Sequence, residues 1–127
     1  QVAALTTDDL AAISTTAFRA LTTDQIAALT TAQAVALTTA QVAALTTAQA
    51  AALETADLAA METADVAAFG TAALRALSTA QLAAFTTDQL AALPGNRVSV
   101  LSQAALALGL SAFIGKQILI FVFLCGQ

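Results

Sequence analysis

The stretch LTTAQAVALTTAQVAAL, residues 29–45, is an eight-residue unit written twice, and copies of this unit extend from Gln1 to about Leu93. Two series of apolar residues carry the repeat. In the first, every step of eight meets a large apolar residue: Leu5, Ile13, Leu21, Leu29, Leu37, Leu45, Leu53, Met61, Phe69, Leu77, Phe85, Leu93, Leu101. The second is apolar throughout and small only twice: Val2, Leu10, Phe18, Ile26, Ala34, Val42, Ala50, Leu58, Val66, Leu74, Leu82, Leu90, Val98. Such a regular array predicts a repeat architecture.

The eight-residue period argues against one long amphipathic helix. Alanine, leucine and glutamine favour helix. A continuous helix advances about 100° per residue, however, so eight residues overshoot two turns by about 80°. The apolar stripe would then rotate around the helix, and no coiled-coil seam would form. The helical signal must therefore be divided into shorter pieces.

The charges indicate where each piece begins and ends. We number every octad so that Thr6, Thr22 and Thr30 occupy position one; the two apolar series then fall at positions five and eight. All eight acidic residues lie at positions one, three or four, whereas Arg19 and Arg75 lie at position six. Acids early and cations late are what a helix dipole favours, so each octad is predicted to carry its own helix.

The cap of each predicted helix has two candidates. The pattern Thr-x-x-Gln, as in Thr30 and Gln33, is typical of a capping box that starts at position one. Position two is threonine in every octad from Thr7 to Thr87, so this residue could be the cap instead. The sequence leaves both assignments open.

A helix this short is unstable alone, because helix nucleation is costly. Neighbouring units must bury what one unit cannot, which predicts an all-α solenoid or superhelix with one short helix per octad. Position six accepts Arg19 and Arg75, while position seven is alanine from Ala4 to Ala92. One flank of each helix is therefore expected to be open and the other closely packed.

The amino-acid composition limits the classes of protein to which this chain can belong. The 127 residues could form one domain; 59% are apolar and only 9% are charged. A net charge of −4 with four basic residues argues against a nucleic-acid surface. The single cysteine, Cys125, excludes an intrachain disulfide.

The sequence divides into three parts. Residues 1–93 are the octapeptide array. Residues 94–103 contain a break at Pro94 and Gly95 followed by a degenerate last repeat, and residues 104–127 are a hydrophobic C-terminal segment.

The C-terminal segment has several interpretations. Residues 104–125 carry one charge, Lys116, and could span a bilayer as a helix. They could equally cap the open end of the array, pack on a second copy as an assembly element, or derive from outside the natural reading frame. The run at 118–124 could also be a strand.

The inventory of reactive residues argues against an enzyme. The chain has no histidine, tryptophan or tyrosine, and it lacks a glycine-rich phosphate loop. Asp8 and Asp9 are interpreted as first-turn charges of a helix, and Cys125 has no candidate base beside it. The sequence therefore predicts no catalytic residue, no cofactor and no small-molecule substrate.

The acidic residues and the threonines each have a functional and a structural interpretation. Four recurring acids could attract a cation such as calcium, but no glycine-rich ligand loop accompanies them: Glu54, Asp57, Glu62, Asp65. We therefore expect a solvated acidic edge and no metal site. The paired threonines are similar in composition to the threonine arrays of ice-binding proteins, yet helix capping explains them more simply.

The residue pattern of the octad resembles that of the tandem octapeptide arrays of large bacterial repeat proteins. An example is Leu37-Thr38-Thr39-Ala40-Gln41-Val42-Ala43-Ala44-Leu45. That resemblance covers residues 1–93 and implies secretion or surface exposure, without a defined activity. A more distant likeness is to the first helix of TAL-effector repeats, which start with a similar Leu-Thr-x-x-Gln-Val. This chain has a much shorter period and lacks their base-reading loop and basic stripe, so DNA binding is not implied.

These observations predict a non-enzymatic structural or spacer array of a bacterial surface or secreted protein. With so few charges and a hydrophobic C-terminal segment, its expected partner is a second copy of itself, in an oligomer or filament. The alternative is a membrane-anchored scaffold or binding module, with residues 104–125 as the anchor.

Overall fold

The computed structural model of the chain describes residues 1–107. The predictions for the segment beyond Ala107 lie outside the described residues. They include those for Lys116, Cys125 and the hydrophobic run at 118–124. A short 3-10 helix, η1 (Val2–Ala4), comes first. It is followed by α1 (Thr7–Ala11), α2 (Thr15–Arg19), α3 (Thr23–Ala27), α4 (Thr31–Val35), α5 (Thr39–Ala43), α6 (Thr47–Ala52), α7 (Thr55–Ala60), α8 (Thr63–Ala67), α9 (Thr71–Arg75), α10 (Thr79–Ala84), α11 (Thr87–Ala91) and α12 (Gly95–Ala107). Residues 1–107 form no strand, so the predicted all-α class is confirmed for the described part of the chain, and each octad from Thr6 to Leu93 carries one short helix.

Position one is the N-cap of every short helix from α1 to α11, and its side chain caps the helix in all of them except α7, α8 and α9. In α4, the Thr30 hydroxyl accepts a hydrogen bond from the Gln33 amide at 3.2 Å, and the Thr30 amide donates to Gln33 Oε1 at 2.9 Å. This reciprocal capping box recurs in α3, α5, α6, α10 and α11. The cap is therefore position one, and the threonine at position two is the first residue of the helix.

Extended backbone between successive helices redirects the chain. After α6, Leu53 and Glu54 have ψ angles of 138° and 151°, and after α7, Met61 and Glu62 have ψ angles of 149° and 150°. The residue at position one is extended before every helix from α1 to α11, so two neighbouring helices do not merge. The repeated turn winds the chain into a coil.

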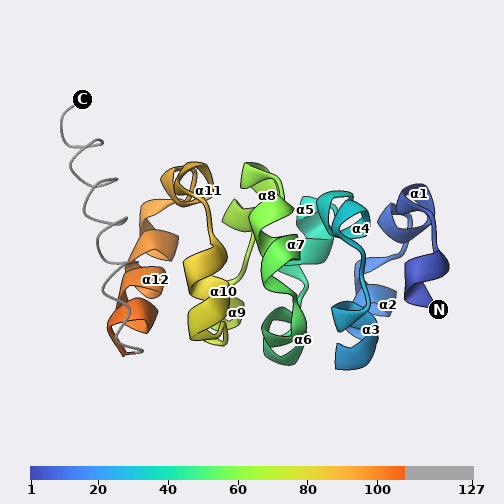
Figure 1. The fold of residues 1–127 in the computed structure, drawn as a ribbon, viewed down its shortest axis with the longest axis horizontal. Helices are drawn as coiled ribbons and strands as arrows, with labels where there is room; N and C mark the ends of the chain where they lie inside the picture. The colour runs from blue at the N-terminus through green and yellow to red at the C-terminus, as the bar shows by residue number, and fades with distance from the viewer. Residues whose placement is uncertain (108–127) are drawn as a thin grey trace.

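Three octads make one coil of the solenoid. Each helix packs on the helix three places along the chain: α1 on α4, α2 on α5, α3 on α6, α4 on α7, and so on to α9 on α12. Figure 1 shows the resulting stack, with η1 and α1 at one end and α12 at the other. Twenty-four residues therefore separate the octads that lie against one another.

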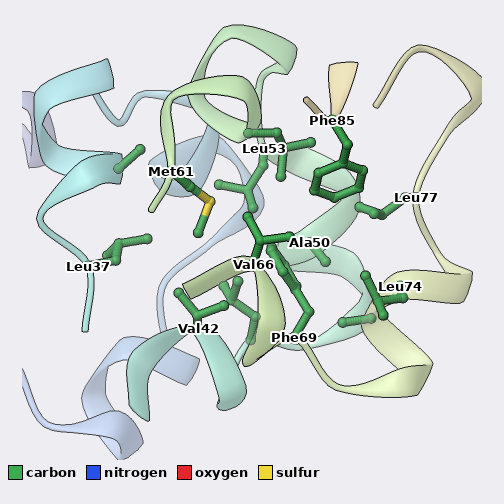
Figure 2. Packing of buried hydrophobic residues seen from close by; sticks show 14 of the residues in the cluster. Leu37, Val42, Ala50, Leu53, Met61, Val66, Phe69, Leu74, Leu77 and Phe85 are labelled. Carbon is green, nitrogen blue, oxygen red and sulfur yellow. The ribbon is translucent and has the colours of Figure 1, made fainter. Parts of the chain in front are cut away.

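The two apolar series fill the interior of this coil. The side chains at position five are almost all completely buried, among them Leu10, Phe18 and Ile26. Position eight is buried from Leu29 onwards, whereas Leu5 at the N-terminal end is 36% exposed. Figure 2 shows side chains of both series between Leu37 and Phe85, contributed by successive octads, gathered in one shared interior. The core is thus a continuous apolar column, to which each octad contributes two residues.

In the middle of the array, the two flanks of the helices differ as the sequence predicts. Position six is exposed at Ala43 and Arg75, whereas position seven is half-buried in every octad from Ala36 to Ala84. In the first coil and at Ala92, position seven is exposed instead. The half-buried alanines lie against neighbouring chain, where a larger side chain would be overpacked.

Replacing Ala44 by leucine should therefore destabilise the protein by about 1–3 kcal/mol, because overpacking forces strained rotamers or backbone shifts. The same substitution at Ala43, one residue earlier in the same octad, should change stability by less than about 0.5 kcal/mol, since that position is exposed. Urea unfolding of the two variants measures both values. Equal losses would mean that the two flanks are packed alike.

The last described helix, α12, departs from the octad length but keeps the register. It begins directly after Pro94 and continues without interruption across residue 104 to Ala107. Leu101 is completely buried, and Val98 is half-buried, so the degenerate repeat still supplies the core. Within residues 1–107, no helix combines the length and the apolar character that a bilayer crossing needs.

Candidate functional site: a glutamine ladder between coils

The glutamine at position four joins one coil to the coil before it. Gln41 Nε2 donates to the carbonyl oxygens of Leu10 and Ile13, at 2.8 Å and 2.9 Å. Its Oε1 accepts from the Thr38 amide at 3.0 Å and so completes the capping box. Gln41 is 1% exposed, and its bond to the Leu10 carbonyl is fully buried, while the other two are partly buried. One side chain therefore caps its own helix and satisfies two carbonyls of the preceding coil.

The same arrangement recurs in a fixed register. The donor bonds to carbonyl oxygens 31 and 28 residues earlier, which belong to positions five and eight. We call this set of side chains the glutamine ladder: Gln33, Gln41, Gln49, Gln81 and Gln89. At the C-terminal end, Arg97 takes the position of the glutamine, and its Nε donates to the Phe69 carbonyl at 3.0 Å.

Comparison with known proteins agrees with this repeat. The model of the ALTTAQ repeat family matches residues 2–39 and 58–94, together more than half of the chain. This chain belongs to the ALTTAQ repeat family. No curated protein and no solved structure matches it.

The letters of the ALTTAQ repeat correspond to positions seven, eight and one to four of the octad, as in residues 36–41. The final glutamine is the ladder residue, and the first threonine is its capping partner. The second threonine, at position two, is exposed in every octad from Thr7 to Thr87. The structure thus explains the first threonine of the pair by capping, while the second lies on the surface.

Three consecutive octads of this ALTTAQ array lack the glutamine. Position four is Asp57 in α7, Asp65 in α8 and Ala73 in α9. These three helices stack on α4, α5 and α6, so we call this the central interface. The central interface is one complete coil-to-coil junction in which no amide side chain can donate to the preceding carbonyls.

The expected solvated acidic edge is wrong for two of its four residues. Glu54 and Glu62 are exposed at position one, as expected. Asp57 and Asp65 are only 2% and 4% exposed, because position four points at the preceding coil and not at solvent. Burial raises the pKa of both carboxyls, and the nearby charges of Glu54 and Glu62 raise them further.

The hydrogen bonds of Asp57 are incomplete. Its Oδ1 accepts from the Thr31 hydroxyl at 3.1 Å, a contact that lowers the pKa of Asp57 against the larger effect of burial. Its Oδ2 is buried and has no hydrogen-bond partner. A buried carboxylate oxygen without a donor is costly, so the central interface is chemically unlike the two glutamine interfaces beside it.

The remaining candidate residues lie apart from the ladder. Asp8 and Asp9 are exposed in the first turn of α1, as predicted. Within residues 1–107, no group of three or more histidine, cysteine or acidic side chains is placed to hold a metal ion.

Proposed function

We propose that this ALTTAQ repeat chain is a non-enzymatic structural or spacer array of a bacterial surface or secreted protein. The observation that supports this function is the constant register of the glutamine ladder, 31 and 28 residues back, at both interfaces where it occurs. At each of these two interfaces, one coil is joined to the preceding coil by the same bonds at the same spacing. Such an array sets a fixed distance that grows with the number of octads.

The polar residues of the array also suit a structural role. The glutamines of the ladder are buried and occupied by bonds to backbone groups, and the position-one hydroxyls cap the helices. Little side-chain chemistry is left for a substrate in the array, which agrees with the absence of histidine from the sequence. We therefore place the function in the length and surface of the array rather than in a reactive site.

The partner that we propose is a second copy of the same chain. Only 9% of the residues are charged, so little electrostatic repulsion opposes contact between copies. The hydrophobic sequence after Ala107 supplies the apolar area that association would bury.

Deleting residues 108–127 should lower the assembly state, because it removes the most hydrophobic part of the chain and leaves α12 intact. Light scattering over a wide concentration range should find oligomers of the intact chain and a smaller species after the deletion. The double substitution Leu119→Glu and Phe121→Glu should have the same effect in the full-length chain. A monomeric intact chain would refute the self-association proposal.

A membrane-anchored module is the second candidate, favoured by the single charge, Lys116, in residues 104–125. Solubility with and without detergent distinguishes the anchored module from the spacer array. An anchored chain should need detergent for solubility and should sediment with lipid vesicles, whereas a spacer should stay soluble and monodisperse or discretely oligomeric without detergent.

A further inference from the structure

The central interface contains acceptors where the neighbouring interfaces contain donors. By the register of the ladder, position four of α7, Asp57, corresponds to the carbonyls of Ile26 and Leu29, and position four of α8, Asp65, corresponds to those of Ala34 and Leu37. In the regular octads, such carbonyl pairs receive an amide Nε2 at 2.7–3.0 Å. Ionised carboxylates cannot donate, so oxygen would face oxygen at two of the three octads.

Within residues 1–107, the helices that pack against these two carboxylates bring no cation to them. Asp57 lies on α7, which packs against α4 and α10, and neither of those helices has an ionisable side chain. Asp65 lies on α8, which packs against α5 and α11, and the one ionisable residue there is the acidic Asp88. The charges that act on the two buried carboxyls are those of Glu54 and Glu62, which are also negative.

A bound proton would remove the conflict. A neutral carboxyl has one O–H donor, and Asp57 Oδ2 is the buried oxygen that has no partner. We propose that the central interface is a proton-operated joint: neutral Asp57 and Asp65 donate to the carbonyls of the preceding coil, as the glutamines do elsewhere, and ionisation of both weakens the junction between residues 1–53 and 54–107.

The direction of the pH dependence follows from the raised pKa values. The ordinary aspartate pKa is 3.8, and burial raises the pKa of both Asp57 and Asp65 above it in the folded chain. The folded state then holds these protons more tightly than the unfolded chain does. The stabilisation is complete below the ordinary pKa and is lost as the pH rises through the raised values.

The test compares the full-length chain with its Asp57→Asn and Asp65→Asn double variant. Asparagine has the same shape as aspartate and keeps a donor at every pH. From pH 7 to pH 4, the unfolding equilibrium constant of the original chain should fall on the order of tenfold relative to the double variant, about the gain of two buried hydrogen bonds. At pH 7 the double variant should be the more stable protein.

The matched control is the double variant Asp8→Asn and Asp9→Asn. It also removes two negative charges, and Asp9 occupies position four like Asp57 and Asp65, but the Asp8 and Asp9 side chains are both exposed. This control should keep the pH dependence of the original chain. Because coils couple only to their neighbours, a weakened junction should also broaden the urea transition at pH 7 or split it in two, and acidification should restore one transition.

Three results would overturn the proposal. The first is an equal pH dependence in the original chain and the Asp57→Asn, Asp65→Asn variant. The second is a variant that is less stable than the original chain at pH 7. The third is stabilisation at pH 7 by added calcium that this variant loses, since a cation rather than a proton would then fill the interface.

Discussion

Gln41→Ala should destabilise the protein by about 2–4 kcal/mol, one of the two largest effects that we expect from a single substitution. The change removes the capping contact to the Thr38 amide and both bonds to the preceding coil. The Leu10 carbonyl keeps the Ile13 amide as a donor at 3.1 Å, whereas the Ile13 carbonyl loses its donor and faces a buried alanine. Each buried acceptor without a partner costs about 1–3 kcal/mol, while a lost cap costs about 1 kcal/mol. Urea unfolding monitored by circular dichroism measures the sum.

Gln25→Ala is the matched control for this substitution. Gln25 also occupies position four, and its Oε1 accepts from the Thr22 amide at 2.8 Å in the same capping box. It lies in the first described coil, however, and among the described residues its Nε2 bonds to no carbonyl of another coil. This variant should lose only about 1 kcal/mol, the value of the cap. If both variants lose the same amount, the bonds between coils contribute nothing to stability.

The local structure of this chain is predictable because its causes lie within eight residues. The acids at early positions, the arginines at position six and the pairing of Thr30 with Gln33 predict a separate helix in each octad, and that is what forms. The asymmetry between exposed Ala43 and half-buried Ala44 could be predicted for the same reason, since substitutions at one position are read directly from other copies of the repeat.

The coil itself could not be predicted from the period. Three octads close one turn because of the backbone angles at residues such as Leu53 and Glu54, and hydrophobic spacing does not specify those angles. The inter-coil bond of Gln41 joins residues 31 positions apart, so no local pattern reveals it. The sequence contains one signal of the bond. The capping box needs only an acceptor at position four, yet most octads have a glutamine there, whose Nε2 is a donor that capping does not use.

The burial of Asp57 and Asp65 was missed for a related reason. Acidic residues in a first helical turn are ordinarily solvated, and the dipole explains them without any further contact. Only the three-octad coil shows that position four points at the preceding turn of the chain. Once that is known, the sequence identifies the central interface at once, because Asp57, Asp65 and Ala73 replace the glutamine in three successive octads.

Phe69→Ala should be the most destabilising single change in the apolar column, with a loss of about 3–5 kcal/mol. Phe69 occupies position eight and is completely buried. Its octad stands in the middle of the stack, so coils on both sides restrict any collapse around the missing ring. The interior here already contains Ala50, a small residue at position five of α6, whose helix packs on α9. Figure 2 shows Phe69 in the same cluster as Ala50 and Val66.

Two further variants distinguish a tightly packed column from a loose one. Leu5→Ala changes the same octad position at the N-terminal end, where the side chain is 36% exposed, and it should cost about 1 kcal/mol or less. Phe69→Leu introduces the residue that is commonest at position eight and should cost less than about 1.5 kcal/mol, because most of the volume is kept. Chemical denaturation of Phe69→Ala, Leu5→Ala and Phe69→Leu ranks the three losses of unfolding free energy. A loss for Phe69→Ala no larger than that for Leu5→Ala would mean that the central coils relax around the cavity, and that the column is held by the ladder rather than by its packing.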